Sequence, residues 1–118
     1  MYRIPDDLDL SKIVGQFTTQ LLVGQYDMQF SFGDIRFAIE SPIELYRDGA
    51  IIGSWIAGAW PPPQFFDVMN SNVISYEIPN NRTIVIRLEN NIEVHLCDNS
   101  DQFECMKISI GDSDPWII

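Results

Sequence analysis

The feature that most constrains the fold of this chain is an alternation of apolar and polar residues that occurs twice, each time around a short polar turn. The first run covers residues 28–41 and turns at Gly33-Asp34. The second covers residues 84–98 and turns at Asn90-Asn91, with one extra residue in the turn. Successive side chains of a strand point to opposite faces, so two such runs joined by a turn predict a β-hairpin with one buried face. We therefore expect the same hairpin module twice.

Further strands are expected on both sides of these hairpins, because the alternation continues there in shorter stretches. Asp48-Gly49 joins two of them and is a strong signal for a tight hairpin turn. The expected strands are 17–23, 26–32, 35–39, 43–46, 51–56, 73–78, 82–89, 92–97 and 103–110.

Two segments have the character of short helices. In residues 5–15, acidic residues occupy the expected first turn, Leu10, Ile13 and Val14 fall on one helical face, and a glycine ends the segment. Residues 64–69 follow three consecutive prolines, and proline suits the first turn of a helix.

One helix precedes a set of strands in each half of the chain, which predicts an α+β fold that is mainly antiparallel β. We expect two pseudo-repeated helix-plus-β-meander units, roughly residues 8–56 and 62–110, that form a bent sheet or half-barrel within a single domain, 1–118. A chain of this length is short for two independent cores but long enough to bury one.

The charge of the chain excludes several classes of partner. It has 17 acidic and 7 basic side chains and a formal net charge of −10. Nucleic acids and anionic membranes bind through Lys and Arg, so direct binding to either is not expected. Two explanations of the acidity remain open: a soluble surface, and a basic protein partner attracted by complementary charge.

No membrane span or leader is expected. The longest run of low charge, residues 50–66, contains two glycines and three prolines, and Met1–Asp7 lacks the basic start and apolar stretch of a secretory signal. These observations predict a cytoplasmic location. The apolar C-terminal segment, residues 112–118, is expected to dock on the sheet.

No catalytic residue, metal site or cofactor is expected, and we do not expect an enzyme. His95 is the only histidine, shares a strand face with Glu93, and lies in none of the familiar hydrolase, nucleotide or metalloprotease motifs. A structural zinc ion needs four convergent ligands, which the chain lacks. Cys97 and Cys105 are either reduced thiols or a disulfide between neighbouring strands.

Three candidate sites remain, each beside a structural alternative. The first is acidic, and is either a solvated rim or a surface that binds a basic partner; its residues are Glu93, Asp98, Asp101, Glu104, Asp112 and Asp114. The second is aromatic, and is either a plug that closes the sheet or an interface with a partner or a second copy; its residues are Trp55, Trp60, Phe65 and Phe66. The third is a small-ligand pocket between the repeats, near Glu44 and Glu104.

Short motifs give the chain a family resemblance. The chain resembles a family of small uncharacterised bacterial proteins of about this length in Val14-Gly15-Gln16, in the LVGQ-like turn Gly24-Gln25-Tyr26 and in Ser100-Asp-Gln-Phe-Glu104. That family implies no activity and supplies no catalytic residues. In size, acidity and single-domain form, the chain also resembles the immunity proteins of polymorphic-toxin and contact-dependent growth inhibition systems. The second resemblance implies a partner that is a basic, nuclease-like toxin domain.

Together these patterns predict a non-enzymatic binding protein, and most specifically an immunity protein that neutralises a basic toxin domain through its acidic surface. The alternatives are a homo-oligomeric structural or regulatory domain, including a homodimer, and a protein that binds a small ligand between the repeats.

Overall fold

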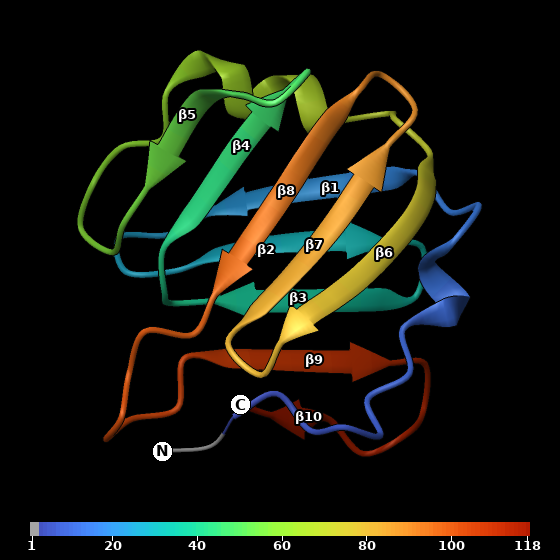
Figure 1. Cartoon of the computed structure of the whole chain (residues 1–118), viewed down its shortest axis with the longest axis vertical. Coiled ribbons are helices and arrows are strands. Elements are labelled where there is room, and N and C mark those ends of the chain that lie inside the picture. Colours follow the sequence, from blue (N-terminus) through green and yellow to red (C-terminus); the bar gives the residue numbers. More distant parts are fainter. Residues whose placement is uncertain (1–2) are drawn as a thin grey trace.

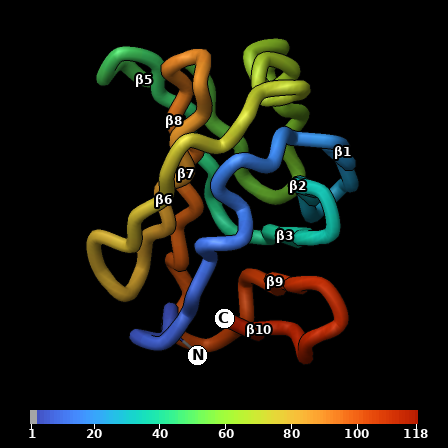
Figure 2. The backbone as a smooth tube through the Cα atoms, turned by 90° about the vertical axis from the view of Figure 1, so that its right-hand side faces the viewer, coloured from blue at the N-terminus to red at the C-terminus, as the bar shows by residue number. Residues whose placement is uncertain are grey.

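A computed structural model describes residues 3–118 and shows two five-stranded antiparallel sheets packed face to face. The strands of one sheet cross those of the other in Figure 1, and Figure 2 shows the two layers from the side. The first sheet has the order β1-β2-β3-β9-β10, with β1 Thr18–Val23, β2 Met28–Phe32, β3 Ile35–Ile39, β9 Met106–Ile110 and β10 Trp116–Ile117. The second has the order β5-β4-β8-β7-β6, with β5 Ala50–Trp55, β4 Ile43–Arg47, β8 Ile92–Cys97, β7 Thr83–Leu88 and β6 Val73–Asn80.

The expected α+β class is wrong, because neither predicted helix forms as an α-helix. The described chain has only two short 3₁₀-helices, η1 Ser11–Ile13 and η2 Pro63–Val68. Near η1 the buried residues include Leu8 and Leu10, a spacing of two that suits extended backbone, whereas Val14 of the predicted helical face is exposed. The hydrogen bonds there span three residues, as from the Ile13 N–H to the carbonyl of Leu10.

The predicted bent sheet or half-barrel is also wrong, because the strands divide into two separate sheets. Each half of the chain supplies a three-stranded meander to one sheet and a hairpin to the other: β1-β2-β3 and β9-β10 form the first sheet, and β6-β7-β8 and β4-β5 form the second. The pairs β3–β9 and β8–β4 join these pieces, both antiparallel. The two halves of the chain therefore exchange their hairpins: each sheet combines the meander of one half with the hairpin of the other. The boundaries expected for the repeat, 8–56 and 62–110, stay a prediction.

The core lies between the two sheets. Alternate residues of the central strands face inward and are almost fully buried, including Phe30, Phe37, Leu45, Val94 and Ile108. The docking of the apolar C-terminal segment is confirmed, since β10 pairs with β9 and Ile118 is fully buried. Both sheets are therefore closed over one apolar interior.

Local hairpin predictions are confirmed where the turn residues were distinctive. Asp48 and Gly49 between β4 and β5 have φ of 52° and 83°, the positive values that a two-residue hairpin turn of type I′ requires.

No helix in residues 3–118 is long and apolar enough to cross a membrane. Met1 and Tyr2, part of the stretch in which no leader is expected, lie outside the described residues.

Candidate protein-binding surface

Two loops meet at one end of the sandwich and support each other. The turn between β1 and β2, residues 24–27, lies against residues 56–60, which follow β5. The N–H of Gly58 donates to the carbonyl of Gln25 at 2.8 Å. From the core side of the loop, the indole N–H of Trp55 donates to the carbonyl of Ala59 at 2.9 Å. The position of the second loop is thus fixed both from the core and from the neighbouring turn.

The two loops and the last residue of β1 carry four large apolar side chains that are exposed: Val23, Tyr26, Ile56 and Trp60, which we call the apolar end. Trp60 is the most exposed of them, at 89% of its surface. It borders a hollow of about 390 Å³, which is lined by Val23, Gly24, Gln25, Gly58, Ala59 and Trp60. Trp is costly to leave in water and is enriched at protein interfaces, so this cluster has the character of a contact surface.

The register of the first sheet lines up three carboxylates, of which Asp27 adjoins the apolar end through Tyr26. Met28 of β2 lies opposite Ile39 of β3, which lies opposite Met106 of β9. Asp27 directly precedes β2, Glu40 directly follows β3, and Glu104 lies shortly before β9. The three carboxylates therefore lie at the same end of these three strands. We call Asp27, Glu40 and Glu104 the acidic row.

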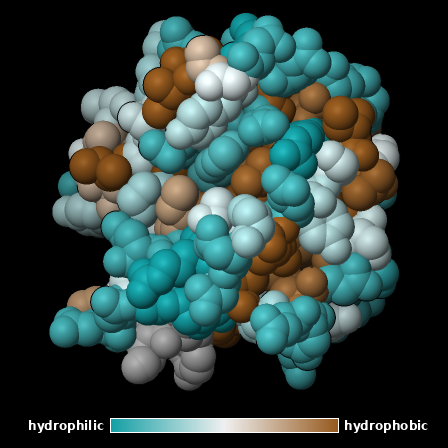
Figure 3. Space-filling model, viewed as in Figure 1, coloured by the Kyte–Doolittle hydropathy of each residue, from teal (hydrophilic) through white to brown (hydrophobic). Residues whose placement is uncertain are grey.

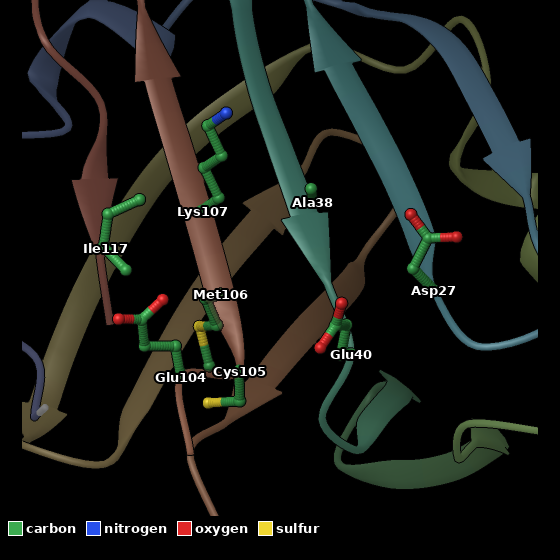
Figure 4. Close-up of a pocket in the computed structure, with 8 residues that line it drawn as sticks. All are labelled: Asp27, Ala38, Glu40, Glu104, Cys105, Met106, Lys107 and Ile117. Atoms are coloured by element: carbon green, nitrogen blue, oxygen red, sulfur yellow. The ribbon is translucent and has the colours of Figure 1, made fainter. Parts of the chain in front are cut away.

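The acidic row surrounds a second hollow, of about 250 Å³. Figure 4 shows the three carboxylates at the strand ends and Ala38 on the sheet between them. Asp27 accepts a hydrogen bond from the amide of Gln29 at 3.1 Å. No salt bridge in residues 3–118 involves a carboxylate of this row. Lys107 lines the same hollow but forms no salt bridge with the row, so these carboxylates are free to pair with an external cation.

Two of the six acidic residues expected to bind a partner pair with arginines of this chain. Asp98 is only 3% exposed, and it accepts hydrogen bonds from the guanidinium of Arg3 at 3.3 Å and the thiol of Cys105 at 3.3 Å. Asp101 accepts from Arg82 at 2.7 Å and from Arg3. The hydrogen bonds from Arg82 and Arg3 lower the pKa of Asp101. This cluster ties the start of the chain to the 98–101 loop.

Glu93 also has internal partners, on the outer face of the second sheet. It accepts from Arg87 at 2.9 Å and contacts the ring of His95 at 3.0 Å, while Arg87 reaches Glu77 on the neighbouring strand at 2.8 Å. The ring of His95 also packs on Tyr46, with ring centroids 4.4 Å apart. Figure 3 shows this face, on which hydrophilic residues cover most of the surface and smaller apolar patches lie between them.

Acid should weaken the sheet through Glu93. The hydrogen bond with His95, and then the bonds and charge of Arg87, lower the pKa of Glu93 below its ordinary value of 4.5. A lowered pKa means that ionised Glu93 stabilises the fold above about pH 4.5, and that this contribution is lost as the pH falls through the lower value of the folded state. In urea unfolding at pH 7 and pH 3, Glu93→Gln should therefore lose less stability on acidification than the wild type. An equal loss in both proteins would contradict this role of Glu93.

The remaining acidic candidates do not form one surface. Glu104, Asp112 and Asp114 are exposed, but Glu104 precedes β9 whereas Asp112 and Asp114 follow it. They therefore lie at opposite ends of the first sheet. Of the six residues, only Glu104 belongs to the acidic row, and Asp27 and Glu40 were missed.

The aromatic set is divided by the structure. Trp55 and Phe65 are each 1% exposed and belong to the core, so they form the plug and not the interface. Trp60 and Phe66 point outward. The alternation of β5 ends at Trp55, and no periodicity in the proline-rich segment that follows marks which rings turn inward.

The structure places Glu44 and Glu104, the residues near which a ligand pocket was expected, on different sheets. Glu44 lies on the outer face of the second sheet and accepts a hydrogen bond from the hydroxyl of Tyr46 at 3.4 Å. Glu104 belongs to the acidic row, at the strand ends of the first sheet. Residues 3–118 contain no group of three or more His, Cys, Asp or Glu side chains that could hold a metal ion.

Both cysteines are free, so the disulfide alternative is not realised. Burial raises the pKa of the Cys97 thiol, with a further contribution from the charge of Glu44. Burial likewise raises the pKa of Cys105 to about 11. Both groups are thus thiols at neutral pH and not the thiolates that nucleophilic catalysis needs.

Tyr26, Asp27 and Glu40 were missed for a common reason. Each lies just outside a strand, and only the pairing of β2, β3 and β9 brings them together. The predicted turn at Gly24-Gln25 was the one local signal. No protein-family model, curated protein or solved structure matches this chain.

Proposed function

We propose that this chain is a non-enzymatic binding protein that takes a basic protein partner on the apolar end and the acidic row. The observation that carries the proposal is the exposure of Trp60 beside a hollow, next to carboxylates without a cationic partner in the described chain. Tyr26 and Asp27 are consecutive, so the apolar and acidic parts adjoin.

This arrangement matches the composition of protein interfaces. Their binding energy is concentrated in a few large side chains, with Trp, Tyr and Arg over-represented, while charges around them set association rate and partner choice. Here Trp60 and Tyr26 provide the anchors, and the acidic row provides the charge. A complementary partner has an apolar side chain that fills the hollow beside Trp60. It also has Lys or Arg residues that reach the carboxylates of the acidic row.

The finer form of the proposal is an immunity protein for a basic, nuclease-like toxin domain. It is supported by the net charge of −10 and by carboxylates that take the place of phosphates in a nucleic-acid groove. The alternative, a homo-oligomer, uses the same apolar end against a second copy. Sedimentation of the purified chain separates the two, because a strict monomer removes the alternative.

The direct test is co-expression with the product of the neighbouring gene, followed by titration of any complex with salt. We expect a complex whose association rate falls steeply as salt rises, since steering between opposite charges is screened. A complex whose association rate does not depend on salt would contradict a basic partner. A monomer that binds nothing would contradict the proposal as a whole.

Trp60→Ala should weaken such a complex by about 2 kcal/mol, or roughly thirtyfold in Kd, as expected for a central aromatic anchor. The free energy of unfolding should change little, since the side chain is almost fully exposed. Ile74→Ala on β6 is the matched control, an exposed apolar residue outside both the apolar end and the acidic row. Calorimetric titration of both variants checks the assignment, and equal weakening in both would refute it.

A further inference from the structure

The outer face of the first sheet carries two of the basic side chains of the protein, Arg36 and Lys107. The register aligns two rows of outward-facing side chains across its strands. The first row is Gln20, Ser31, Arg36 and Ser109, and the second is Leu22, Gln29, Ala38, Lys107 and Ile117. The two rows hold two cations and no carboxylate.

The cations of this face lack the partners that other cations have. Among residues 3–118, ion pairs are formed by Arg3, Arg47, Arg82 and Arg87. Lys12, Arg36 and Lys107 form none within that range. Two of the three cations without an ion pair lie in these two rows, and the carboxylates beside the rows, Asp27, Glu40 and Asp34, form no salt bridge with them. That placement leaves their charge for a ligand.

A hollow of about 190 Å³ lies around Arg36, lined by Ser31, Gly33, Asp34, Arg36 and Ser109. Arg36 stands directly between the two serines, opposite Ser31 of β2 and opposite Ser109 of β9. Pockets for drug-sized ligands span about 300–1,000 Å³, so this hollow suits a smaller group.

Ser31, which lines the hollow, has one of the four buried hydroxyls without a hydrogen-bond partner in residues 3–118, with those of Thr18, Ser41 and Ser71. Its residue is only 5% exposed, and its hydroxyl oxygen is buried without a hydrogen-bond partner in the described chain. A buried hydroxyl with no partner is destabilising, and an acceptor placed in the hollow would remove that cost.

Lys107 adds a second charge from the neighbouring row. Figure 4 shows its side chain running along β9 toward the C-terminal end of that strand, away from the carboxylates of Glu40 and Glu104. Ser109 follows in that direction, two residues later on the same face. Lys107 lines the hollow of the acidic row and not the hollow around Arg36, so it adds positive charge to the Arg36 hollow only from a distance.

We infer that the hollow around Arg36 binds a phosphate group. The planar guanidinium presents two parallel donors to two phosphate oxygens, the hydroxyls of Ser31 and Ser109 donate to the others, and Lys107 supplies further positive charge. Asp34 is the one carboxylate that lines the hollow, and it opposes the anion. This site is separate from the apolar end and does not depend on the proposed partner.

The test is titration of ¹⁵N-labelled protein with inorganic phosphate at constant ionic strength, with chloride as the reference anion. We expect saturable shifts of the backbone amides of Gly33, Arg36 and Ser109. Shifts no larger than those caused by chloride would overturn the inference. A second titration with glycerol 3-phosphate identifies the source, because tighter binding than that of free phosphate indicates a phosphomonoester ligand, and either order supports the site.

Matched variants separate a site from general charge attraction. Arg36→Gln should weaken phosphate binding by at least about tenfold, the effect of losing charged hydrogen bonds. Lys12→Gln removes the same charge at another unpaired cation and should leave binding within about twofold. Equal losses in both variants would show non-specific attraction and overturn the site.

Asp34→Asn tests the geometry in the opposite direction. Removal of the one opposing carboxylate should tighten phosphate binding by several-fold, since like charges in one small site repel. Weaker binding in this variant would mean that Asp34 organises Arg36, and would overturn the inference. Thermal unfolding of each variant verifies that it is folded at the temperature of the titration.

Discussion

Trp55→Ala is expected to lower the free energy of unfolding by about 3–5 kcal/mol, the range found when a buried Phe or Trp is truncated. Trp55 ends β5, is 1% exposed and is among the largest fully buried side chains. The substitution leaves a cavity between the sheets. It also removes the donor that satisfies the carbonyl of Ala59 and holds the 56–60 loop.

Urea unfolding at pH 7 measures this loss. Ile51→Ala on the same strand is the control, since Ile51 is exposed and its truncation should cost less than about 0.5 kcal/mol. Trp55→Phe keeps a smaller aromatic ring in the core but not the indole donor, so it should fall between the two. A loss for Trp55→Ala as small as that of Ile51→Ala would mean that this ring does not anchor the core.

Asp98→Ala should be the second most damaging substitution, at about 2–4 kcal/mol. Breaking a fully buried ion pair costs about 3–5 kcal/mol, and we expect less here because the side chain of Arg3 is 27% exposed. The variant also removes the acceptor of the Cys105 thiol and of the N–H of Ser100. Asp98→Asn keeps an acceptor of the same size and should lose less.

Asp101→Ala provides the matched control, because Asp101 pairs with the same Arg3 from a side chain that is 73% exposed. Exposed ion pairs contribute little to stability, so unfolding should be nearly unchanged. Chemical denaturation of the three variants ranks them. If Asp101→Ala proved as harmful as Asp98→Ala, charge alone and not burial would explain the effect.

The strands that the sequence predicted best are those with strict alternation and a distinctive turn. The strands 35–39 and 92–97 were expected with the bounds that the structure shows. Both follow short turns, and hairpin pairing is set by residues that are close in the chain. The Asp48-Gly49 turn belongs to the same class, because only a few residue types tolerate positive φ at both positions.

The absence of α-helices and the arrangement of the two sheets could not be predicted from the local sequence pattern. The spacing of Leu10, Ile13 and Val14 suits a helix, but burial of Leu8 and Leu10 against the core overrides that preference. The pairing of β3 with β9 joins segments separated by residues 40–105, and no local signal specifies it. The predicted strand 103–110 begins only at Met106, which leaves Phe103 exposed in a loop.

The candidate surface shows the same limit. Its exposed tryptophan, Trp60, and one of its carboxylates, Glu104, were among the predicted residues. Asp27 and Glu40 have no motif of their own and gain meaning only from sheet register. Acidity in the sequence did not distinguish Asp98, buried and paired inside the fold, from carboxylates that face outward.

The exchange of hairpins between the two layers governs how this chain reaches its native state. The first sheet cannot gain β9 and β10 until residues 106–117 have been synthesised, so its central pair β3–β9 forms late during translation. Such non-local pairing gives a high contact order, and proteins of this kind fold over milliseconds to seconds. Until then β3 presents an unpaired edge that can recruit the β9-β10 hairpin of another nascent chain. The same topology that links the halves within one molecule thus offers two molecules a route to intertwine.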